Sequence, residues 1–434
     1  MKRTHYVAEI DARKHAGKRV TVAGWTHEIR DFGAVKFVIL RDRTGLIQLT
    51  FKKGGSASAT ALKNADALVK ETAIACTGIV VEKTVAGVGR ELLAEELEII
   101  SPVLKQVPFE VTGKVPADID VRLNHRIIDL RRPETTAVFK IRSEAQRAFR
   151  DACYELGCQE ITPPCLVSSS TEGGANLFSL KYFEQQAFLA QSPQLYKQLA
   201  VLGGMDRVFM ITPVFRAEKH NTTTHLNEVT QMDVEIGFAD ANDALDALEK
   251  VTLHILAHVK KNCARELEML GSKISVPKKI SRHDYDEIVE ALNSSGVEFK
   301  WGEDFPKDVE EKIPELFGEE LFFITNWPTK TRAFYSMPFE EKPDICKAYD
   351  LIYKGLEIAS GAQRIHDPNL LVQQLKLHGL HPHDFESYID AFRYGAPPHA
   401  GWSIGLERLT MKLANRSNIR ECSLFPRDRH RLTP

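Results

Sequence analysis

The sequence has no long apolar run and no paired cysteines. No stretch of about 18 apolar residues occurs in the 434 residues, so no membrane-spanning helix is predicted. The first residues also lack the apolar core of a signal peptide. The seven cysteines are scattered and none forms a CxxC pair, so neither a disulfide framework nor a cysteine zinc site is supported. We therefore expect a cytoplasmic protein in a reducing compartment.

Further absences narrow the class of protein. The chain contains no internal repeat, no low-complexity tract and no GxxxxGK[ST] phosphate loop, so P-loop chemistry is not indicated. A net charge of −2 argues against a generic nucleic-acid coat. Apolar residues make up 43% and charged residues 27%, as in ordinary globular proteins. The length fits two or three domains.

The charge is unevenly distributed along the chain. Residues 1–53 contain twelve Lys or Arg and five Asp or Glu, a balance of +7, so the remainder carries −9. A basic N-terminal module on an acidic body is suited to hold a polyanion at one end. A chance cluster of charges on a solvated face explains the same count equally well.

Residues 17–102 have the pattern of a small β domain. Alternation of apolar and polar residues predicts strands at 19–25, 36–40, 46–50, 72–81 and 91–100. A helical stretch at 59–69 lies between the third and fourth strands. Five short strands with one inserted helix are typical of an oligonucleotide-binding (OB) β-barrel, although many small β domains share this pattern.

Prolines mark a hinge after this module. Pro102, Pro108 and Pro116 lie in or next to a stretch without periodicity. Beyond it, helical spacing predicts helices at 135–156, ended by Gly157, and at 240–260. We therefore divide the chain into a barrel domain at 1–103, a linker at 104–134 and an α+β domain at 135–434. The last contains an inserted α/β segment of unassigned role at about 276–340.

The first polar motif is VFRAE at residues 214–218, which a long polar loop follows. Strand-like residues flank the motif and its loop, so we expect a hairpin. A strand that presents Arg216 and Glu218 on one face can place a guanidinium over a phosphate, because the arginine fork is planar and always charged. A solvent-facing Arg–Glu pair on a sheet is the competing explanation.

Two more motifs occur towards the C-terminus. Residues 401–409 (GWSIGLERL) have small residues at alternate positions, which lets a strand lie close beneath a flat ligand. Close backbone packing alone would explain the same pattern. Asp350 and Glu357 lie seven residues apart and are suited to bind Mg²⁺ between nucleotide phosphates. Alternatively, each acid pairs with a neighbouring Lys or Arg.

In this order, the motifs resemble those of the class II aminoacyl-tRNA synthetases over essentially the whole chain. Residues 157–164 resemble motif 1, residues 215–218 with their loop motif 2, and residues 401–408 motif 3. The ending LFPRDR at 424–429 with RLTP at 431–434 is similar to that of archaeal and eukaryotic aspartyl-tRNA synthetases. The resemblance implies an OB-fold anticodon domain, a catalytic antiparallel sheet flanked by helices, and a homodimer with Pro164 at its interface.

The resemblance also implies a nucleotide site in which Arg216 and Arg408 are catalytic. The expected ATP contacts are Arg216 at the α-phosphate, Arg408 at the γ-phosphate, Glu218 at the adenine, His225 at the outer phosphates, Glu357 and Gly405. The expected Mg²⁺ ligands are Asp350, Glu357 and Ser360. Two positions depart from the family pattern. Val229 stands where many members have a Phe that stacks on adenine, and Thr224 where close relatives have Arg.

The aspartate pocket implied by the resemblance includes residues 192–198 (SPQLYKQ) and the loop at 170–174. Lys197 and Arg364 would bind the side-chain carboxylate, with Gln194 and Asp233 setting the geometry. Glu172 would meet the substrate ammonium, with Ser360 nearby. Two cations facing one carboxylate reject asparagine, because its neutral amide would leave buried charge unpaired. No general base is needed, since the substrate carboxylate is already a nucleophile; positioning and charge neutralisation by Arg216 and Mg²⁺ remain.

The barrel would read the anticodon. Phe37 is suited to stack on a base, and Gln48 and Glu91 to bind base edges. Strand alternation alone would instead place Phe37 in the core. In the family, strict enzymes tend to have Trp where this chain has His27, and a Lys in the hairpin near Gly87, which is missing here. We therefore expect a relaxed enzyme that charges both tRNA-Asp and tRNA-Asn, unless His27 is an ordinary exposed strand residue.

The predicted function is thus ATP-dependent ligation of L-aspartate to tRNA through aspartyl-adenylate. A strict aspartyl enzyme remains open. Lys197 with Arg364 argues against an asparaginyl-tRNA synthetase. A non-catalytic RNA-binding paralogue is the alternative of another class, and the presence of Arg216, Arg408, Asp350 and Glu357 argues against it.

Overall fold

The computed structural model describes residues 2–84, 86–168, 177–219 and 222–434. The chain divides into two compact units, Met1–Thr136 and Ala137–Pro434. Among the described helices, none combines the length and the apolar character needed to cross a membrane.

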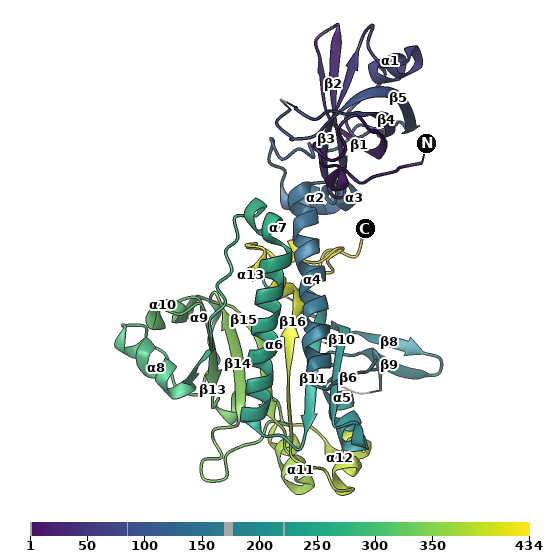
Figure 1. The fold of residues 1–434 in the computed structure, drawn as a ribbon. Coiled ribbons are helices and arrows are strands. Elements are labelled where there is room, and N and C mark those ends of the chain that lie inside the picture. The colour runs from purple at the N-terminus through teal and green to yellow at the C-terminus, as the bar shows by residue number, and fades with distance from the viewer. Residues whose placement is uncertain (1, 85, 169–176, 220–221) are drawn as a thin grey trace. The chain divides into compact units, whose positions relative to one another are not determined.

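The first unit contains a closed barrel of five strands in the order β1-β2-β3-β5-β4 (Figure 1). The strands are β1 (Arg19–Asp31), β2 (Val35–Asp42), β3 (Gly45–Lys52), β4 (Ala73–Val80) and β5 (Glu91–Ser101). Helix α1 (Ala59–Asp66) begins after Ser58, whose hydroxyl accepts a hydrogen bond from the Ala61 N–H. The inward residues of all five strands form one apolar core. The expected barrel with one helix between the third and fourth strands is confirmed.

Short helices complete this unit: η1 (Val7–Glu9), α2 (Ile119–Asn124) and α3 (Arg126–Asp129). The stretch at 104–134 is therefore partly helical. Its anchor is Asp129, a fully buried carboxylate that pairs with Arg122 at 2.7 Å and with Arg126. The two arginines offset the desolvation penalty of this buried carboxylate.

The second unit is built on an eight-stranded sheet in the order β12-β13-β14-β15-β16-β11-β10-β6. The strands from β13 to β10 are antiparallel, and the pairs at the two edges are parallel. The bounds are β6 (Gln159–Glu160), β10 (Arg207–Phe215), β11 (Glu228–Gly237), β12 (Ser281–Asp284), β13 (Leu321–Thr325), β14 (Ala348–Tyr353), β15 (Glu357–Gln363) and β16 (His399–Gly405). A separate small sheet contains β7 (Leu166–Val167), β8 (Ser179–Tyr182) and β9 (Gln185–Leu189).

Two long helices, α4 (Pro133–Glu155) and α6 (Ala241–Asn262), lie side by side across one face of this sheet (Figure 1). Phe149 of α4 packs edge-to-face on Phe209 and on Trp402 of the sheet, with ring centroids 5.8 and 6.2 Å apart. The apolar residues of both helices join the largest core cluster. An antiparallel sheet flanked by helices, as expected, is confirmed.

Shorter helices complete the second unit. They are α5 (Gln194–Ala200), η2 (Val201–Met205), α7 (Ala264–Met269), α8 (Tyr285–Ser294), α9 (Lys307–Glu310), α10 (Ile313–Phe317), η3 (Thr329–Thr331), α11 (Pro368–Leu377), η4 (Pro382–Phe385), α12 (Glu386–Arg393), α13 (Leu406–Leu413) and η5 (Ile419–Glu421). The segment at 276–340 contributes β12 and β13 to the main sheet, so it extends the sheet beyond β14.

The face of the sheet away from α4 and α6 is polar at its centre. Ser403 of β16 pairs in register with Asp233 of β11 on one side and with Ser360 of β15 on the other, and Ser360 pairs with Asp350 of β14. Because strand residues alternate between faces, these four side chains share one face, while neighbours such as Trp402 point into the helix-covered core. The register thus forms a polar row across four adjacent strands.

Candidate active site

One end of the polar face is a buried cluster of four ionisable side chains. Asp233 and Glu235 lie on β11, Lys197 on α5, and Arg364 directly after β15; each is at most 3% exposed. The Lys197 Nζ lies 2.9 Å from Asp233 Oδ1 and 3.4 Å from Glu235 Oε2. Arg364 donates from Nε and Nη2 to the two carboxylate oxygens of Glu235, at 2.9 and 3.1 Å.

The cluster contains two cations and two carboxylates, and the two carboxylates have different surroundings. Burial raises the pKa of Asp233, although Lys197 opposes the shift. Burial acts on Glu235 in the same direction, but the Arg364 and Lys197 charges outweigh it and hold the pKa of Glu235 below its usual value. Glu235 is therefore a fixed anion that orients both cations.

The backbone beneath the cluster has to be glycine. A Cβ on Gly401 would lie 2.2 Å from Glu235 Oε2, and a Cβ on Gly361 would lie 2.5 Å from the Tyr349 ring. Both glycines let bulky charged and aromatic side chains of neighbouring strands lie flat on the sheet. Gly401 of the 401–409 motif is thus needed for close packing, whereas a Cβ on Gly405 of the same motif would meet no atom closer than 3.9 Å.

A chain of hydrogen bonds holds helix α5 beside the cluster. Gln194 Nε2 donates to Gln198 Oε1, and Gln198 Nε2 donates to His399 Nε2, both at 2.9 Å. His399 Nδ1 lies 2.9 Å from the Pro397 carbonyl oxygen, and Tyr388 OH donates to Gln198 Oε1. His399 therefore carries its proton on Nδ1, and burial lowers its pKa, which keeps it neutral.

At the other end of the polar face, Arg408 contacts both Glu357 and His225. Arg408 Nη1 lies 3.3 Å from Glu357 Oε2, and its Nη2 lies 3.2 Å from His225 Nε2. Desolvation of the His225 ring, together with the Arg408 charge, lowers the pKa of His225. The other ring nitrogen is 2.8 Å from Thr222 Oγ1.

Arg216 follows directly after β10, at the start of the loop that returns to β11. Its backbone N–H donates to the Asn227 carbonyl oxygen at 2.9 Å, and Asn227 Nδ2 donates to the Arg216 carbonyl oxygen at 2.7 Å. Asn227 also reaches the Glu218 carbonyl oxygen, at 3.3 Å. One asparagine thus fixes the backbone on which the predicted phosphate-binding arginine and Glu218 stand.

Asp350 has a partner that the sequence did not reveal. Arg332 binds its carboxylate with two nitrogens, at 3.2 and 2.5 Å, and stacks over the Trp327 ring. Burial raises the pKa of Asp350 to about 6, against the opposing charge of Arg332. The Ser360 hydroxyl also hydrogen-bonds Asp350.

Glu310, on α9 of the same 276–340 segment as Arg332, accepts a hydrogen bond from the Glu357 backbone N–H. Burial, together with the Glu357 charge, raises the pKa of Glu310 to about 7. Sequence reasoning missed Glu235, Arg332 and Glu310. Glu235 had a signal, because it follows Asp233 by two residues on a predicted strand and must share its face. Arg332 and Glu310 had none.

The remaining predicted residues lie as follows. Gln194 is buried at the start of α5, Gly405 precedes α13, and Val229 is half-buried against the main core. Thr224 is buried, with its hydroxyl 3.2 Å from His225 Nδ1. Pro164 is exposed. Glu172 lies outside the described residues.

Three of the predicted anticodon residues, Phe37, Gln48 and Glu91, lie on neighbouring strands of the barrel, and Gln48 is buried, with 8% of it exposed. Phe37 pairs with Thr50, and Gln48 pairs with Glu91 across β3 and β5. Thr50 Oγ1 donates to Glu91 Oε1 at 2.5 Å. Phe37 is half-buried and contacts the exposed Phe32 edge-to-face; it is not among the core residues, so the core explanation is wrong.

His27 and Gly87 have contrasting surroundings. His27 is 8% exposed, and its Nδ1 accepts a hydrogen bond from Arg41 Nη1 at 2.7 Å. Arg41 in turn binds both carboxylate oxygens of Glu71. The reading of His27 as an ordinary exposed strand residue is therefore wrong. Gly87 is exposed, and a Cβ there would meet nothing within 4 Å.

Comparisons with known proteins agree with this architecture. Residues 118–429 match the family model described as tRNA synthetases class II (D, K and N), and residues 20–100 match the OB-fold nucleic acid binding domain. The aspartate--tRNA(Asp/Asn) ligase of Methanocaldococcus jannaschii is 49% identical, with 100% of this chain and 98% of the relative covered. The aspartate--tRNA(Asp) ligase of Pyrococcus abyssi is 45% identical, with both chains covered completely.

Solved structures show the same fold along the whole chain. The asparaginyl-tRNA synthetase from Pyrococcus horikoshii complexed with asparaginyl-adenylate has a TM-score of 0.94 at 32% identity, with 100% of both chains covered. The aspartyl tRNA synthetase from Entamoeba histolytica has a TM-score of 0.88 at 30% identity, with 100% of this chain and 93% of that chain covered. Fold similarity therefore extends to enzymes for both amino acids, and the pocket must decide between them.

Proposed function

The chain belongs to the class II tRNA synthetases of the D, K and N group, and on that basis we propose that it joins L-aspartate to tRNA at the expense of ATP. The observation that carries the choice of amino acid is the buried cluster of Lys197, Arg364, Asp233 and Glu235. The names of the relatives at 44–49% identity support the same choice.

The cluster favours aspartate over asparagine through the directions of its hydrogen bonds. Arg364 uses Nε and Nη2 on Glu235, which leaves Nη1 to bind a substrate carboxylate. Lys197 already donates to Asp233 and to the Trp402 carbonyl oxygen, so it contributes its positive charge to the pocket. A carboxylate only accepts hydrogen bonds, whereas the NH₂ group of asparagine only donates and would face two cations. Discrimination of this kind is strong because a wrong ligand leaves buried polar groups unpaired.

The nucleotide would lie along the other end of the polar face. Arg216 is assigned to the α-phosphate and Arg408, next to His225, to the outer phosphates, because guanidinium groups bind phosphate oxygens in pairs. Glu218 and Gly405 would adjoin the rest of the nucleotide. The loop of Glu172 would close over the amino acid.

The donor set fits Mg²⁺, which takes oxygen ligands. Asp350, Ser360 and Glu357 offer two carboxylates and one hydroxyl, with Asp350 and Ser360 paired in register. When bound, Mg²⁺ would neutralise charge on the phosphates. Arg332 and Arg408 already neutralise these carboxylates in the free chain, so both would share them with the ion or move aside.

The first step then needs no general base. An oxygen of the aspartate α-carboxylate attacks the α-phosphorus, the bond to pyrophosphate breaks, and Arg216 stabilises the charge that grows on the α-phosphate. Lys197 and Arg364 contribute by fixing the substrate side chain, so that the attacking carboxylate is held in line. The second step transfers the aspartyl group to the terminal ribose of tRNA.

We assign relaxed tRNA choice, with charging of both tRNA-Asp and tRNA-Asn, and a homodimer whose interface includes the exposed Pro164. The assignment of relaxed tRNA choice rests on His27 and Gly87, and several relatives are named for both tRNAs. Overall identity does not decide the question, because a relative named for tRNA(Asp) alone is 45% identical.

The test is aminoacylation with labelled aspartate and asparagine, each against tRNA-Asp and tRNA-Asn transcripts. We expect aspartate on both tRNAs and asparagine on neither. Aspartate on tRNA-Asp alone would leave the ligase assignment intact and refute relaxed choice. Charging of asparagine alone would refute the pocket argument, and absence of ATP–pyrophosphate exchange would leave only an RNA-binding protein.

A matched pair of variants then locates tRNA choice. Gly87→Lys introduces the missing lysine where the structure has open space, so folding should be unaffected. The control is Lys83→Gln, which changes an exposed charge of the same hairpin. Gly89→Lys is not used, because Gly89 has a positive φ and a lysine there would strain the backbone. If this hairpin allows the enzyme to accept both tRNAs, Gly87→Lys should lower charging of tRNA-Asn more than charging of tRNA-Asp. Lys83→Gln should not have this effect.

A further inference from the structure

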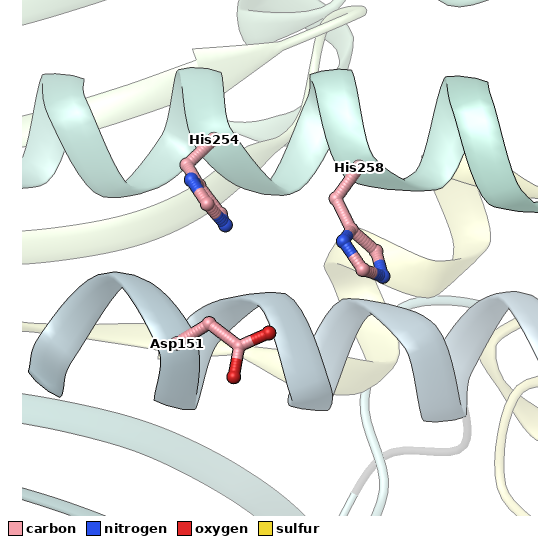
Figure 2. A group of neighbouring side chains, drawn as sticks. All are labelled: Asp151, His254 and His258. Atoms are coloured by element: carbon pink, nitrogen blue, oxygen red, sulfur yellow. The ribbon is translucent and has the colours of Figure 1, made fainter. Parts of the chain in front are cut away.

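Three potential metal ligands meet on the outer side of the helix pair α4 and α6, away from the polar face of the sheet. Asp151 lies on α4, and His254 and His258 lie on α6 (Figure 2). Each offers one ligand atom, and these three atoms lie within 4.8 Å of one another. No step of the proposed reaction uses them.

Helix geometry brings the three side chains together. His254 and His258 are four residues apart, so they project from the same side of α6 one turn after the other. Their rings are nearly parallel, 18° apart, with centroids at 6.3 Å. Both point towards α4, where Asp151 faces them (Figure 2). The two helices are held by a common apolar core, so the spacing of the three groups is fixed by packing.

The hydrogen bonds of these residues leave their ligand atoms accessible. His258 Nε2 lies 2.7 Å from Glu144 Oε2, which orients the ring and leaves Nδ1 to bind an ion. A carboxylate behind a histidine is the usual support of a metal-binding imidazole. His254 makes no hydrogen bond with any described residue. Asp151 has an ion pair with Arg147 at 3.8 Å, in which both side chains are about half exposed or more, so Arg147 can turn away.

We propose that Asp151, His254 and His258 bind one Zn²⁺ ion, with Glu144 as the supporting carboxylate. Two imidazoles and a carboxylate suit zinc, whereas Mg²⁺ and Ca²⁺ require oxygen ligands. Zinc ligands at about 2.0–2.1 Å lie roughly 3.4 Å apart in a tetrahedron, so small side-chain rotations close the site. Water completes it. The ion cross-links α4 to α6 and stabilises the folded second unit by an amount that rises with the free zinc concentration.

The experiment is equilibrium dialysis of the untagged full-length chain against Zn²⁺ in excess Mg²⁺, with bound zinc measured by mass spectrometry. Excess Mg²⁺ occupies oxygen-only sites such as that near Asp350. We expect one zinc per chain, loss of that zinc in His254→Ala and in Asp151→Asn, and retention in His378→Ala, which removes a half-buried histidine elsewhere. No zinc on the parent chain, or equal zinc on all four proteins, would overturn the proposal.

Two further readouts keep the result independent of folding defects. Asp151 is exposed, so Asp151→Asn should melt like the parent in the absence of metal. Zinc should then raise the melting temperature of the parent and of His378→Ala but not of Asp151→Asn. Glu144→Gln should weaken zinc binding about 10–100-fold without abolishing it. A Glu144→Gln variant with parental affinity, or a zinc-dependent rise in Asp151→Asn, would contradict the assignment.

Discussion

Arg216 is the residue whose removal should affect chemistry most and folding least. Its backbone is fixed by Asn227, and it directly follows Phe215, the last residue of β10. We expect Arg216→Gln to lower ATP–pyrophosphate exchange about 10²–10³-fold, the loss typical for one group that stabilises a charged transition state. The control is Lys219→Gln, an exposed charge in the same loop. Equal losses in both variants would point to general electrostatics rather than to a positioned arginine.

Glu310 gives the folded chain a pH dependence that can be checked without substrates. Burial raises its pKa to about 7 from the model-peptide value of 4.5, so between these values the folded chain holds a proton that the unfolded chain has lost. The free energy of unfolding therefore falls as the pH rises from about 5 to 7. Glutamine keeps the size of the side chain and cannot titrate.

We expect Glu310→Gln to melt at the parental temperature near pH 5 and roughly 2–4 °C above it near pH 7.5. Calorimetry without ATP and Mg²⁺ measures this difference. A difference that stays constant across the pH range would show that the carboxyl group is ionised in the folded chain throughout.

The predictable residues of the site are those that belong to a local pattern. Asp233, Ser360 and Arg408 were predicted because they stand in or near short motifs that resemble those of a known family; in the structure Asp233 and Ser360 lie on β11 and β15, and Arg408 lies on α13. Arg332 and Glu310 could not be found, because a buried charge is recognised by its partner and their partners lie 18 and 47 residues away along the chain. Phe37 was ambiguous for another reason: an outward aromatic on a barrel strand has the same sequence pattern as an inward one.

Among the elements, the strand β15 depends directly on a single glycine, Gly361. A Cβ on Gly361 would lie 2.5 Å from Tyr349, 2.6 Å from the Gly401 carbonyl oxygen and 2.7 Å from Trp402 Cβ. We expect Gly361→Ala to destabilise the second unit by about 1–3 kcal/mol or more, the usual cost of overpacking. Gly405→Ala is the control, since the nearest atoms to its Cβ lie at 3.9 Å. Thermal melting compares the two, and equal melting temperatures would mean that the strands can separate without cost.

Regular elements were predicted well where their period was clear. Helix α6 was expected at 240–260 and spans Ala241–Asn262, and α4 was expected at 135–156 and spans Pro133–Glu155. The strand β13 was not identified. Its residues Leu321–Thr325 are all buried, so it shows a continuous apolar run that does not distinguish a strand from a buried helix. That ambiguity is why the segment at 276–340 could not be joined to the main sheet from the sequence.

At the scale of the whole molecule, each unit has its own core, which predicts independent folding. The barrel strands form a separate apolar cluster within residues 1–136. We expect residues 1–136 expressed alone to melt cooperatively and to bind an anticodon stem-loop with an affinity that falls steeply with salt, because phosphate contacts release counterions. Circular dichroism and binding titrations at two salt concentrations measure both. A gradual, non-cooperative melt would show that the barrel requires the second unit.

The polar row of Asp233, Ser403, Ser360 and Asp350 has a consequence for how such a chain can diverge. Each position is set by strand register, so exchanging one side chain alters a ligand contact and leaves the other three in place. Inserting or deleting one residue within β15 or β16 would instead turn polar positions towards the helix-covered core and apolar ones towards the substrate. Point substitutions can therefore change substrate preference gradually, whereas a change in the length of either strand would disrupt the whole site.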